Sequence, residues 1–245
     1  MNALVSYRFE DSVATITMDD GKVNVLSPAM ISELDHALDR ATADEAVVVL
    51  TSTARAFSAG FDLGVLARGG AETVALVSGG FELAARLLSF PRPVVIACNG
   101  HAVAMGVFLL LSGDYRVGAA GSYKITANEV ALGLPMPGPA IEICRQRLAP
   151  AHFNRAVLLA EVYSPDDAVA AGFLDRVVPA AELGAAAQGV AAELAKLDMD
   201  AHATTKLRVR EESLTRIRAA IGSAAGLGVP PERREPSERH DAQPA

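Results

Sequence analysis

The chain has 245 residues, of which 51% are hydrophobic, and a formal net charge of −7 at pH 7. A chain of this length can bury an ample core in one large domain. Its acidic balance disfavours nucleic acid and anionic membrane surfaces, so we exclude both classes as main partners.

Cysteine usage and targeting signals bear on metal binding and location. Cys98 and Cys144 are the two cysteines of the chain, without CxxC spacing and without clustered histidines. We therefore expect buried thiols in a reducing compartment, with no disulfide and no metal site. No apolar run approaches the length of a membrane span, and no secretory leader follows Met1. These features predict a cytoplasmic protein.

The first part of the chain alternates predicted strands and helices. Residues 7–18 alternate polar and apolar side chains around a turn at Glu10-Asp11, which predicts a β-hairpin. Ser27-Pro28 offers an N-cap and a proline at the first helical position, so a helix should begin there and run to about Ala43. The other segments are predicted as a loop at 22–26, a strand at 47–50, a loop at 55–63, a mobile glycine-bearing segment at 64–70 and a helix at 76–88.

The stretch 93–114 is the apolar centre of the chain. Residues 94–97 form a short β-branched run typical of a strand covered on both faces, and Asn99-Gly100 favours a turn. Residues 102–111 are apolar on every side, which predicts a fully buried helix. Because its first turn is built mostly of small residues and a helix N-terminus leaves N–H groups unpaired, this turn could hold an anion or a developing oxyanion. A core helix packed through alanine and glycine explains the same residues.

The second half of the chain continues the alternation and ends in helices. The predicted elements are strands at 115–117, 122–125 and 175–178, a loop at 126–138, helices at 141–148, 153–159 and from Ser164, and final helices at 180–197 and 202–221. Alternation with short links predicts an α/β fold with a largely parallel sheet, and the last helices form a separate layer. We expect a core domain over residues 1–178, a helical region over 179–221 and, because little there can be buried, a disordered tail over 222–245.

Four motifs, in order along the chain, resemble those of the crotonase (enoyl-CoA hydratase/isomerase) superfamily. They are AFSAGFDL at 56–63, NGHAVAMG at 99–106 with LSGDYRVG at 111–118, NEVALGL at 128–134, and SPDDAVAAGFLDRVVP at 164–179. The resemblance covers about residues 4–218 and implies a spiral of ββα units followed by a helical trimerisation layer. It also implies an acyl thioester of coenzyme A (CoA) as substrate, no other cofactor, and a homotrimer or a hexamer formed by a dimer of trimers.

The resemblance also implies site residues. The backbone N–H groups of Phe61 and Met105 should form an oxyanion hole for the thioester carbonyl, and each such donor is typically worth about 3 to 4 kcal/mol. The side chains of both residues should crowd the acyl pocket. The residues expected to contact CoA or substrate are Lys22, Val23, Val25, Arg55, Phe57, Ala59, Gly60 and Phe108. Lys22 or Arg55 should lie near a phosphate, although a solvated surface cation explains either residue.

The catalytic carboxylate separates the reactions of the superfamily. Hydratases of the superfamily carry two glutamates, whereas here the helix position holds Phe108 and the loop position holds Glu129. This loop resembles that of Δ3,Δ2-enoyl-CoA isomerases, in which a single glutamate moves a proton. The apolar run 130–132 should desolvate Glu129 and raise its pKa toward values useful for a general base.

We therefore expect an enoyl-CoA isomerase that uses Glu129. The alternatives are a hydratase with an atypical site, another reaction on an acyl-CoA, and a non-catalytic acyl-CoA-binding homologue, which is favoured if Glu129 points away from the pocket. Ser58 lacks a paired histidine and aspartate, which disfavours serine hydrolysis. His101 is expected to be a hydrogen-bonded core residue, and Asp62 and Asp114 to cap or tie loops.

Overall fold

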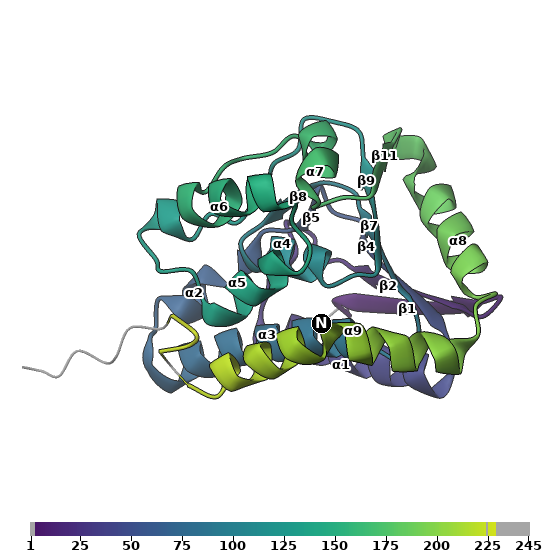
Figure 1. Cartoon of the computed structure of the whole chain (residues 1–245), viewed down its shortest axis with the longest axis horizontal. Coiled ribbons are helices and arrows are strands. Elements are labelled where there is room, and N and C mark those ends of the chain that lie inside the picture. The colour runs from purple at the N-terminus through teal and green to yellow at the C-terminus, as the bar shows by residue number, and fades with distance from the viewer. Residues whose placement is uncertain (1–2, 224, 229–245) are drawn as a thin grey trace, which may run out of the picture.

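The computed structural model describes residues 3–223 and 225–228. Within them, the main sheet has six strands in the order β1-β2-β4-β7-β9-β11 (Figure 1). The β1–β2 pair is antiparallel and the other pairs are parallel, which confirms the expected α/β fold. The strands are β1 (Val5–Glu10), β2 (Val13–Met18), β4 (Val47–Ser52), β7 (Val94–Cys98), β9 (Tyr115–Ala119) and β11 (Arg176–Val178).

The predicted hairpin and the helix after it are confirmed. The hairpin turn lies at Asp11-Ser12, one residue later than expected, with φ angles of 49° and 63°. Positive φ at both central residues is what a two-residue hairpin turn of the favoured twist requires. Ser27 caps the next helix as predicted, because its Oγ accepts a hydrogen bond of 3.1 Å from Met30 N.

Two smaller sheets contain segments that the sequence placed in loops. One is β10 (Ile125–Thr126), β8 (His101–Val103) and β5 (Ala56–Ser58), and the other pairs β3 (Val25–Leu26) with β6 (Gly60–Phe61). The prediction of plain loops at 22–26 and 55–63 is therefore wrong. Strands of two or three residues are too short to show an alternating pattern, so nothing in the local sequence could indicate them.

Helices cover both faces of the main sheet (Figure 1). On one face, α8 packs through Leu183, Ala187 and Ala191 against valines and alanines of the strands. The larger core lies on the opposite face, where α1, α3 and α4 contribute many of the buried side chains. The helices are α1 (Pro28–Ala43), α2 (Leu63–Leu66), α3 (Gly70–Ser89), α4 (Met105–Leu111), α5 (Gly138–Arg145), α6 (Pro150–Leu159), α7 (Pro165–Ala171), α8 (Leu183–Leu194) and α9 (Met199–Ile221), with short 3-10 turns η1 (Val130–Leu132) and η2 (Ala180–Glu182).

The segment 64–70, expected to be mobile, is largely structured. It contains most of α2, which Asp62 caps by accepting hydrogen bonds from Gly64 N and Val65 N. Thr73 Oγ1 donates to the carbonyl oxygens at the end of α2, at 3.2 Å each. These contacts stabilise the first turn of α3, which begins at Gly70 rather than near Leu76.

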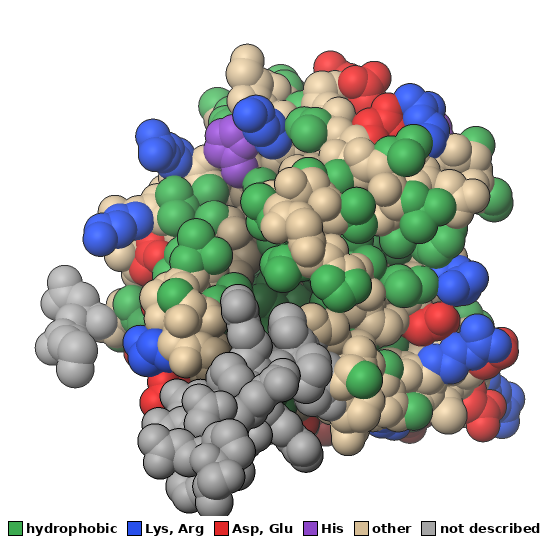
Figure 2. Space-filling model, turned by 90° about the vertical axis from the view of Figure 1, so that its left-hand side faces the viewer, with side chains coloured by type: hydrophobic (Ala, Val, Ile, Leu, Met, Phe, Trp, Pro, Cys, Tyr) green, Lys and Arg blue, Asp and Glu red, His purple; other side chains and the backbone are tan. Residues whose placement is uncertain are grey.

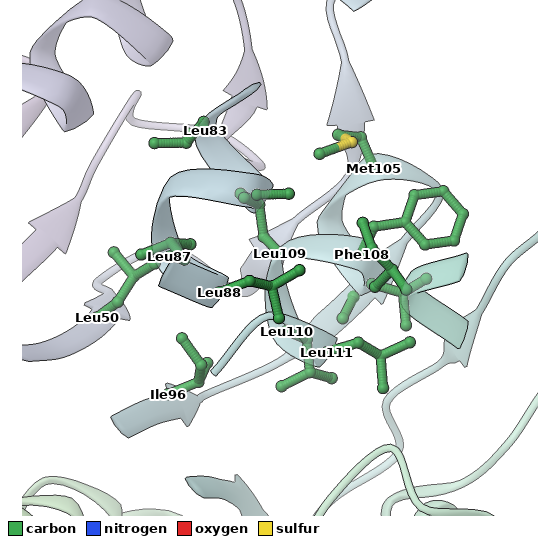
Figure 3. Packing of buried hydrophobic residues seen from close by; sticks show 14 of the residues in the cluster. Leu50, Leu83, Leu87, Leu88, Ile96, Met105, Phe108, Leu109, Leu110 and Leu111 are labelled. Atoms are coloured by element: carbon green, nitrogen blue, oxygen red, sulfur yellow. The ribbon is translucent and has the colours of Figure 1, made fainter. Parts of the chain in front are cut away.

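The central helix α4 differs from its prediction only at its beginning. β8 occupies 101–103, Ala104 turns the chain with φ 50°, and the helix begins at Met105 rather than at Ala102. Every residue of α4 is buried, as predicted. Figure 3 shows Met105 and Phe108 together on one side of α4, while Leu109 lies on the side of α3.

The last helix α9 packs against α3 and α5 and is tied to the sheet by buried charges. Asp114 Oδ2 accepts hydrogen bonds from Val94 N at 2.8 Å and from Lys206 Nζ at 2.6 Å. Its Oδ1 lies 2.9 Å from Arg210 Nη2. Asp114 thus ties the β7–β9 region to α9, which extends its expected role from a loop to the packing of a whole helix.

Part of the expected tail belongs to the core. Leu227 is buried against the main hydrophobic cluster, and Gly138 N donates to the carbonyl oxygen of Gly226 at 2.8 Å. The prediction that packing stops at about residue 221 is therefore too early. Residues 224 and 229–245 lie outside the described part of the chain, and their disorder stays a prediction.

Candidate active site

Strand β6 and the start of α4 meet with no side chain between them. Gly60 has φ 91°, and a Cβ atom on it would lie 3.3 Å from Met105 N and 3.1 Å from Val103 O. A Cβ on Gly106 would lie only 2.3 Å from the carbonyl oxygen of Ser58. Both glycines therefore allow a backbone contact that other residues would block. This contact holds Phe61, the residue after Gly60, at the beginning of α4.

The N–H group of Met105 has no acceptor among the described residues. The first hydrogen bond at this end of α4 runs from Val107 N to Ala104 O at 2.9 Å. Ala104 lies at φ 50° and ψ −127°, a backbone conformation that costs energy for a residue with a side chain. This conformation of Ala104 turns the chain from β8 into α4. It leaves the N–H of Met105 free, and this group can donate to an oxygen atom of a ligand.

The short β3–β6 sheet brings the expected CoA segment beside the candidate oxyanion hole. Val25 pairs with Gly60 in parallel register, and Ala59 N donates to Val23 O at 3.0 Å. Val23, Val25 and Ala59 are half-buried. The structure therefore places these predicted binding residues next to the contact between β6 and α4.

Three of the predicted binding residues also line one open surface pocket. Lys22, Val23 and Arg55 border a depression of about 830 Å³. Lys22 and Arg55 are exposed, so their charges are available to an anionic ligand. Phe57 differs, because its side chain is completely buried in the core and leaves only its backbone for a ligand.

Asp20 and Asn24 shape this region, and we did not predict either. The Asp20 carboxylate accepts hydrogen bonds from Lys22 N at 2.7 Å, Asn24 N at 2.9 Å and Val25 N at 2.9 Å. Although partial burial opposes it, these backbone donors lower the pKa of Asp20. Asn24 is buried at φ 53°, and its Nδ2 donates to the Ala56 carbonyl at 3.0 Å. An aspartate directly before Gly21 and an asparagine three residues after it were the available turn signal.

Glu129 is buried, with 8% of its surface exposed. Burial raises its pKa to about 7, against a weaker opposing effect of its own backbone N–H. Its Oε2 is fully shielded and has no hydrogen-bond partner among the described residues. Burial, followed by the charge of Glu129, raises the pKa of Cys144 on α5. A carboxyl group in this setting can exchange a proton near neutral pH.

The source of this burial differs from the one expected. The prediction that 130–132 would cover Glu129 is wrong, because Val130 is 41% exposed and Leu132 61% exposed. Glu129 immediately precedes the η1 turn, and its charge acts on Cys144, a member of the main hydrophobic cluster, so the buried carboxylate lies beside the core. Figure 2, which views the molecule from the side of α2 and α6, shows apolar side chains gathered on that face.

Aromatic rings line the side of α4 that carries Met105. Phe108 is 1% exposed, and its ring centroid lies 5.9 Å from that of Phe81. Phe81 in turn lies 6.4 Å from Phe61 in an edge-to-face arrangement. Phe108 thus presents an apolar ring on the same side of α4 as Met105 (Figure 3).

The sequence as a whole matches a known family over nearly all of the described residues. Residues 8–224 match the family described as enoyl-CoA hydratase/isomerase. The chain belongs to this family. The crotonase fold expected from the four motifs is thereby confirmed, and the sheet and the helical layer described above are those of this crotonase.

Relatives of this crotonase include proteins named for either reaction. A Mycobacterium tuberculosis protein, described as an enoyl-CoA isomerase in one solved structure and as a probable enoyl-CoA hydratase in another, has 48% sequence identity and a TM-score of 0.88. The first of these structures covers 92% of this chain and 99% of its own. The human mitochondrial Δ3-Δ2-enoyl-CoA isomerase has 26% identity and a TM-score of 0.82, covering 91% and 94%. A probable enoyl-CoA hydratase from Rhodobacter capsulatus is 31% identical over 82% of this chain and 79% of its own. Family membership therefore supports an enzyme acting on enoyl-CoA without fixing its reaction.

The minor candidates in this crotonase have structural roles. Ser58 Oγ donates to Asn24 O at 2.8 Å and accepts a hydrogen bond from Gly60 N, so it stabilises the glycine turn. His101 Nδ1 accepts a hydrogen bond of 3.0 Å from Lys124 N, and its ring packs edge-on against Tyr123. His101 is thus hydrogen-bonded, as expected, but it lies half-buried in β8 rather than in the core.

Metal-site and membrane-spanning features are both absent from the part of the chain that the structure describes. Over 3–223 and 225–228, no three His, Cys, Asp or Glu side chains are grouped as a metal site would require. Across the same residues, none of the helices has the length and apolar character needed to cross a bilayer.

The raised pKa of Glu129 predicts a pH-dependent stability. The folded state holds the Glu129 proton up to about pH 7, whereas the unfolded state releases it near its ordinary value of 4.5. The unfolded state therefore binds fewer protons in this window, and the free energy of unfolding falls as pH rises through it. Glu129→Gln cannot lose a proton, so the variant should gain about 2 to 3 kcal/mol over the wild type between pH 5 and pH 8. Urea titrations of both proteins at each pH measure this gain, and a pH-independent difference would contradict it.

Proposed function

We propose that the protein is an enoyl-CoA isomerase that converts 3-enoyl-CoA to 2-enoyl-CoA, with Glu129 as the group that moves the proton. The observation that carries this proposal is a single buried carboxyl group within residues 3–223 and 225–228, the pKa of which is raised to about 7. The position that holds a second glutamate in hydratases of the superfamily is occupied by the buried ring of Phe108.

The reaction requires one base that reaches two carbon atoms. Glu129 takes a proton from C2 of the thioester, the electrons of that C–H bond delocalise through the carbonyl and the C3–C4 double bond, and a dienolate forms. The protonated Glu129 returns the proton to C4, so that the double bond lies between C2 and C3 and the carboxylate is regenerated. A single carboxylate suffices because the two carbon atoms share the negative charge.

The backbone N–H groups of Phe61 and Met105 are proposed to stabilise the oxyanion of this dienolate. The contact at Gly60 and the free N–H of Met105 support this role. Rigid donors directed at developing charge need no reorganisation during the reaction, and loss of one typically costs about 3 to 4 kcal/mol. An apolar surround adds to the effect because charges interact more strongly where water is excluded.

CoA binding is proposed at the pocket beside β3 and β6. Lys22 and Arg55 provide positive charges for the phosphates, while Val23, Val25, Ala59 and Gly60 provide the adjoining backbone. Catalysis without a metal or further cofactor, a homotrimer or a dimer of trimers, and a cytoplasmic location stay predictions drawn from the resemblance and the composition.

The relative rates of isomerisation and hydration test the proposal. Because Phe108 offers no acceptor for a water molecule and dries the site, the purified protein should convert 3-hexenoyl-CoA to 2-hexenoyl-CoA much faster than it hydrates crotonyl-CoA. Absorbance at the conjugated thioester band follows both reactions, since isomerisation increases it and hydration decreases it. Rapid hydration of crotonyl-CoA would refute the isomerase assignment.

Enoyl-CoA hydration is the second candidate. It is favoured by the names of several relatives, including the probable hydratase from Rhodobacter capsulatus. Hydration needs a water molecule held and deprotonated at C3, and in this superfamily two carboxylates do so. Phe108→Glu restores the second carboxyl group, so a gain of crotonyl-CoA hydration in that variant would show that Phe108 separates the two reactions.

A further inference from the structure

The ring of Phe61 packs directly against the backbone of α3 at Gly80, which has no side chain. A Cβ atom on Gly80 would lie 2.4 Å from Cε1 and 2.6 Å from Cζ of the Phe61 ring, and 3.6 Å from Met105 Cγ. Gly80 lies in the interior of α3, where glycine is less favourable than alanine. A glycine at this position therefore has a packing reason, which is to make room for the tip of the Phe61 ring.

Phe61 is the outer member of a row of aromatic rings. Phe81 and Phe108 are each 1% exposed, whereas Phe61 is half-buried. The ring centroids of Phe61 and Phe81 are 6.4 Å apart, and those of Phe81 and Phe108 are 5.9 Å apart. Met105 is also 1% exposed, and its side chain lies near the Phe61 ring at Gly80. The space next to the two candidate oxyanion donors is thus filled by side chains from β6, α3 and α4.

We propose that the Phe61 ring, seated on Gly80, limits the acyl chain to short lengths. The inference rests on the proposed function, because it takes the thioester carbonyl to lie at the N–H groups of Phe61 and Met105. An acyl chain that leaves this carbonyl toward α3 meets the Phe61 ring within a few carbon atoms. Phe61 would then have two separate roles, one for its N–H in the oxyanion hole and one for its ring in chain-length selection.

Binding of saturated acyl-CoA measures the second role without any reaction. Each additional buried methylene group strengthens binding about fourfold, whereas a methylene that remains in water contributes nothing. In the wild type, hexanoyl-CoA and dodecanoyl-CoA should bind with affinities within about threefold of each other. In Phe61→Ala, which keeps the backbone N–H, dodecanoyl-CoA should bind at least tenfold more tightly than hexanoyl-CoA. Isothermal titration calorimetry with free CoA as the reference gives these ratios.

Gly80 and Gly79 provide a matched pair of control variants. Gly79 is the adjacent helical glycine, and a Cβ on it would lie 3.8 Å from Ile31 Cγ2, an ordinary contact. Gly79→Ala should therefore leave the affinity ratio unchanged, whereas Gly80→Ala forces the ring to move and should change the ratio or the hexanoyl-CoA affinity by threefold or more. In the Phe61→Ala background, Gly80→Ala should have less than a twofold effect, because the contact that couples the two residues is gone.

The outcomes separate this inference from the proposed function. If free CoA and both acyl-CoA ligands fail to bind the folded wild type, the proposed function fails and this inference with it. If both acyl-CoA ligands bind and the ratio is the same in wild type and Phe61→Ala, the chain-length role of Phe61 is refuted while the acyl-CoA site stands. If Phe61→Ala does not fold, as judged by circular dichroism, Phe61→Leu replaces it, and a shift of the ratio toward dodecanoyl-CoA of under twofold refutes the role.

Discussion

Glu129→Gln is expected to lower kcat/KM for isomerisation of 3-hexenoyl-CoA by about 100-fold or more, the range typical for a positioned general base. Glutamine preserves the shape of the side chain but has no carboxylate, so it cannot take up and return the proton. Binding of hexanoyl-CoA should stay within about twofold of the wild type, because the amide contacts neither CoA nor the carbonyl oxygen in the proposed geometry. Stopped-flow or steady-state absorbance gives the rate, and calorimetry gives the affinity.

The pH profile makes this prediction specific to a proton-transfer role. Since the pKa of Glu129 in the free protein is raised to about 7, kcat/KM of the wild type should rise about tenfold between pH 6 and pH 8 and then level off. Glu129→Gln should lose this inflection together with its activity. Glu212→Gln is the control, because it removes the carboxylate of a side chain on α9 that is 80% exposed. This variant should keep both the activity and the pH inflection. An undiminished rate in Glu129→Gln, or an inflection that persists in it, would exclude Glu129 as the base.

Asp114→Asn is expected to lower the free energy of unfolding by about 3 to 5 kcal/mol, the usual cost of leaving a buried charge without its partner. The side chains of Lys206 and Arg210 are only 4% and 10% exposed, and the Asp114 carboxylate contacts both. Burial lowers the pKa of Lys206 to about 8 even with Asp114 present. Because Lys206 can give up its charge as pH rises, the loss of stability should be smaller at pH 9 than at pH 7.

Urea unfolding at constant protein concentration measures this loss. Glu193→Gln is the control, since Glu193 pairs with Lys196 where both side chains are about 70% exposed. Exposed pairs contribute between about 0 and 1 kcal/mol, so this variant should unfold near the wild-type midpoint. Equal effects of the two substitutions would show that the Asp114 cluster does not hold α9 in place.

Elements with a strong local pattern were predictable from the sequence. The periodic apolar positions of α1 and the apolar run of β7 determine those elements within the chain segment itself, and their bounds came out nearly right. Glu129 was also singled out from its motif, and the structure buries it in a setting that raises its pKa. Its catalytic role stays a prediction. The predicted cause was wrong because the direction of a side chain in a 3-10 turn depends on the core around it.

Features that depend on distant partners were not predictable. β5 and β6 exist because β8 and β3, far along the chain, offer them hydrogen bonds, and two or three residues contain no pattern of their own. The start of α4 was misplaced because the first residues of the predicted helix form β8 instead. A short apolar run is equally compatible with a strand and with a helix. The partners of Asp114 were equally hidden, since Lys206 and Arg210 look like solvated charges on a helix until α9 packs against the sheet.

The glycine contact between β6 and α4 has a consequence for how the site tolerates mutation. Replacing Phe61 or Met105 leaves the N–H group of that residue in the chain, so the two donors are insensitive to the identity of their own side chains. One methyl group added at Gly60 would instead press against the start of α4, and one added at Gly106 would press against the Ser58 carbonyl of β5. The most mutation-sensitive positions of the proposed oxyanion hole are thus two residues that carry no functional group. In an evolving or engineered lineage, substitutions at Phe61 and Met105 can change the substrate range, whereas Gly60 and Gly106 have to be retained for the reaction.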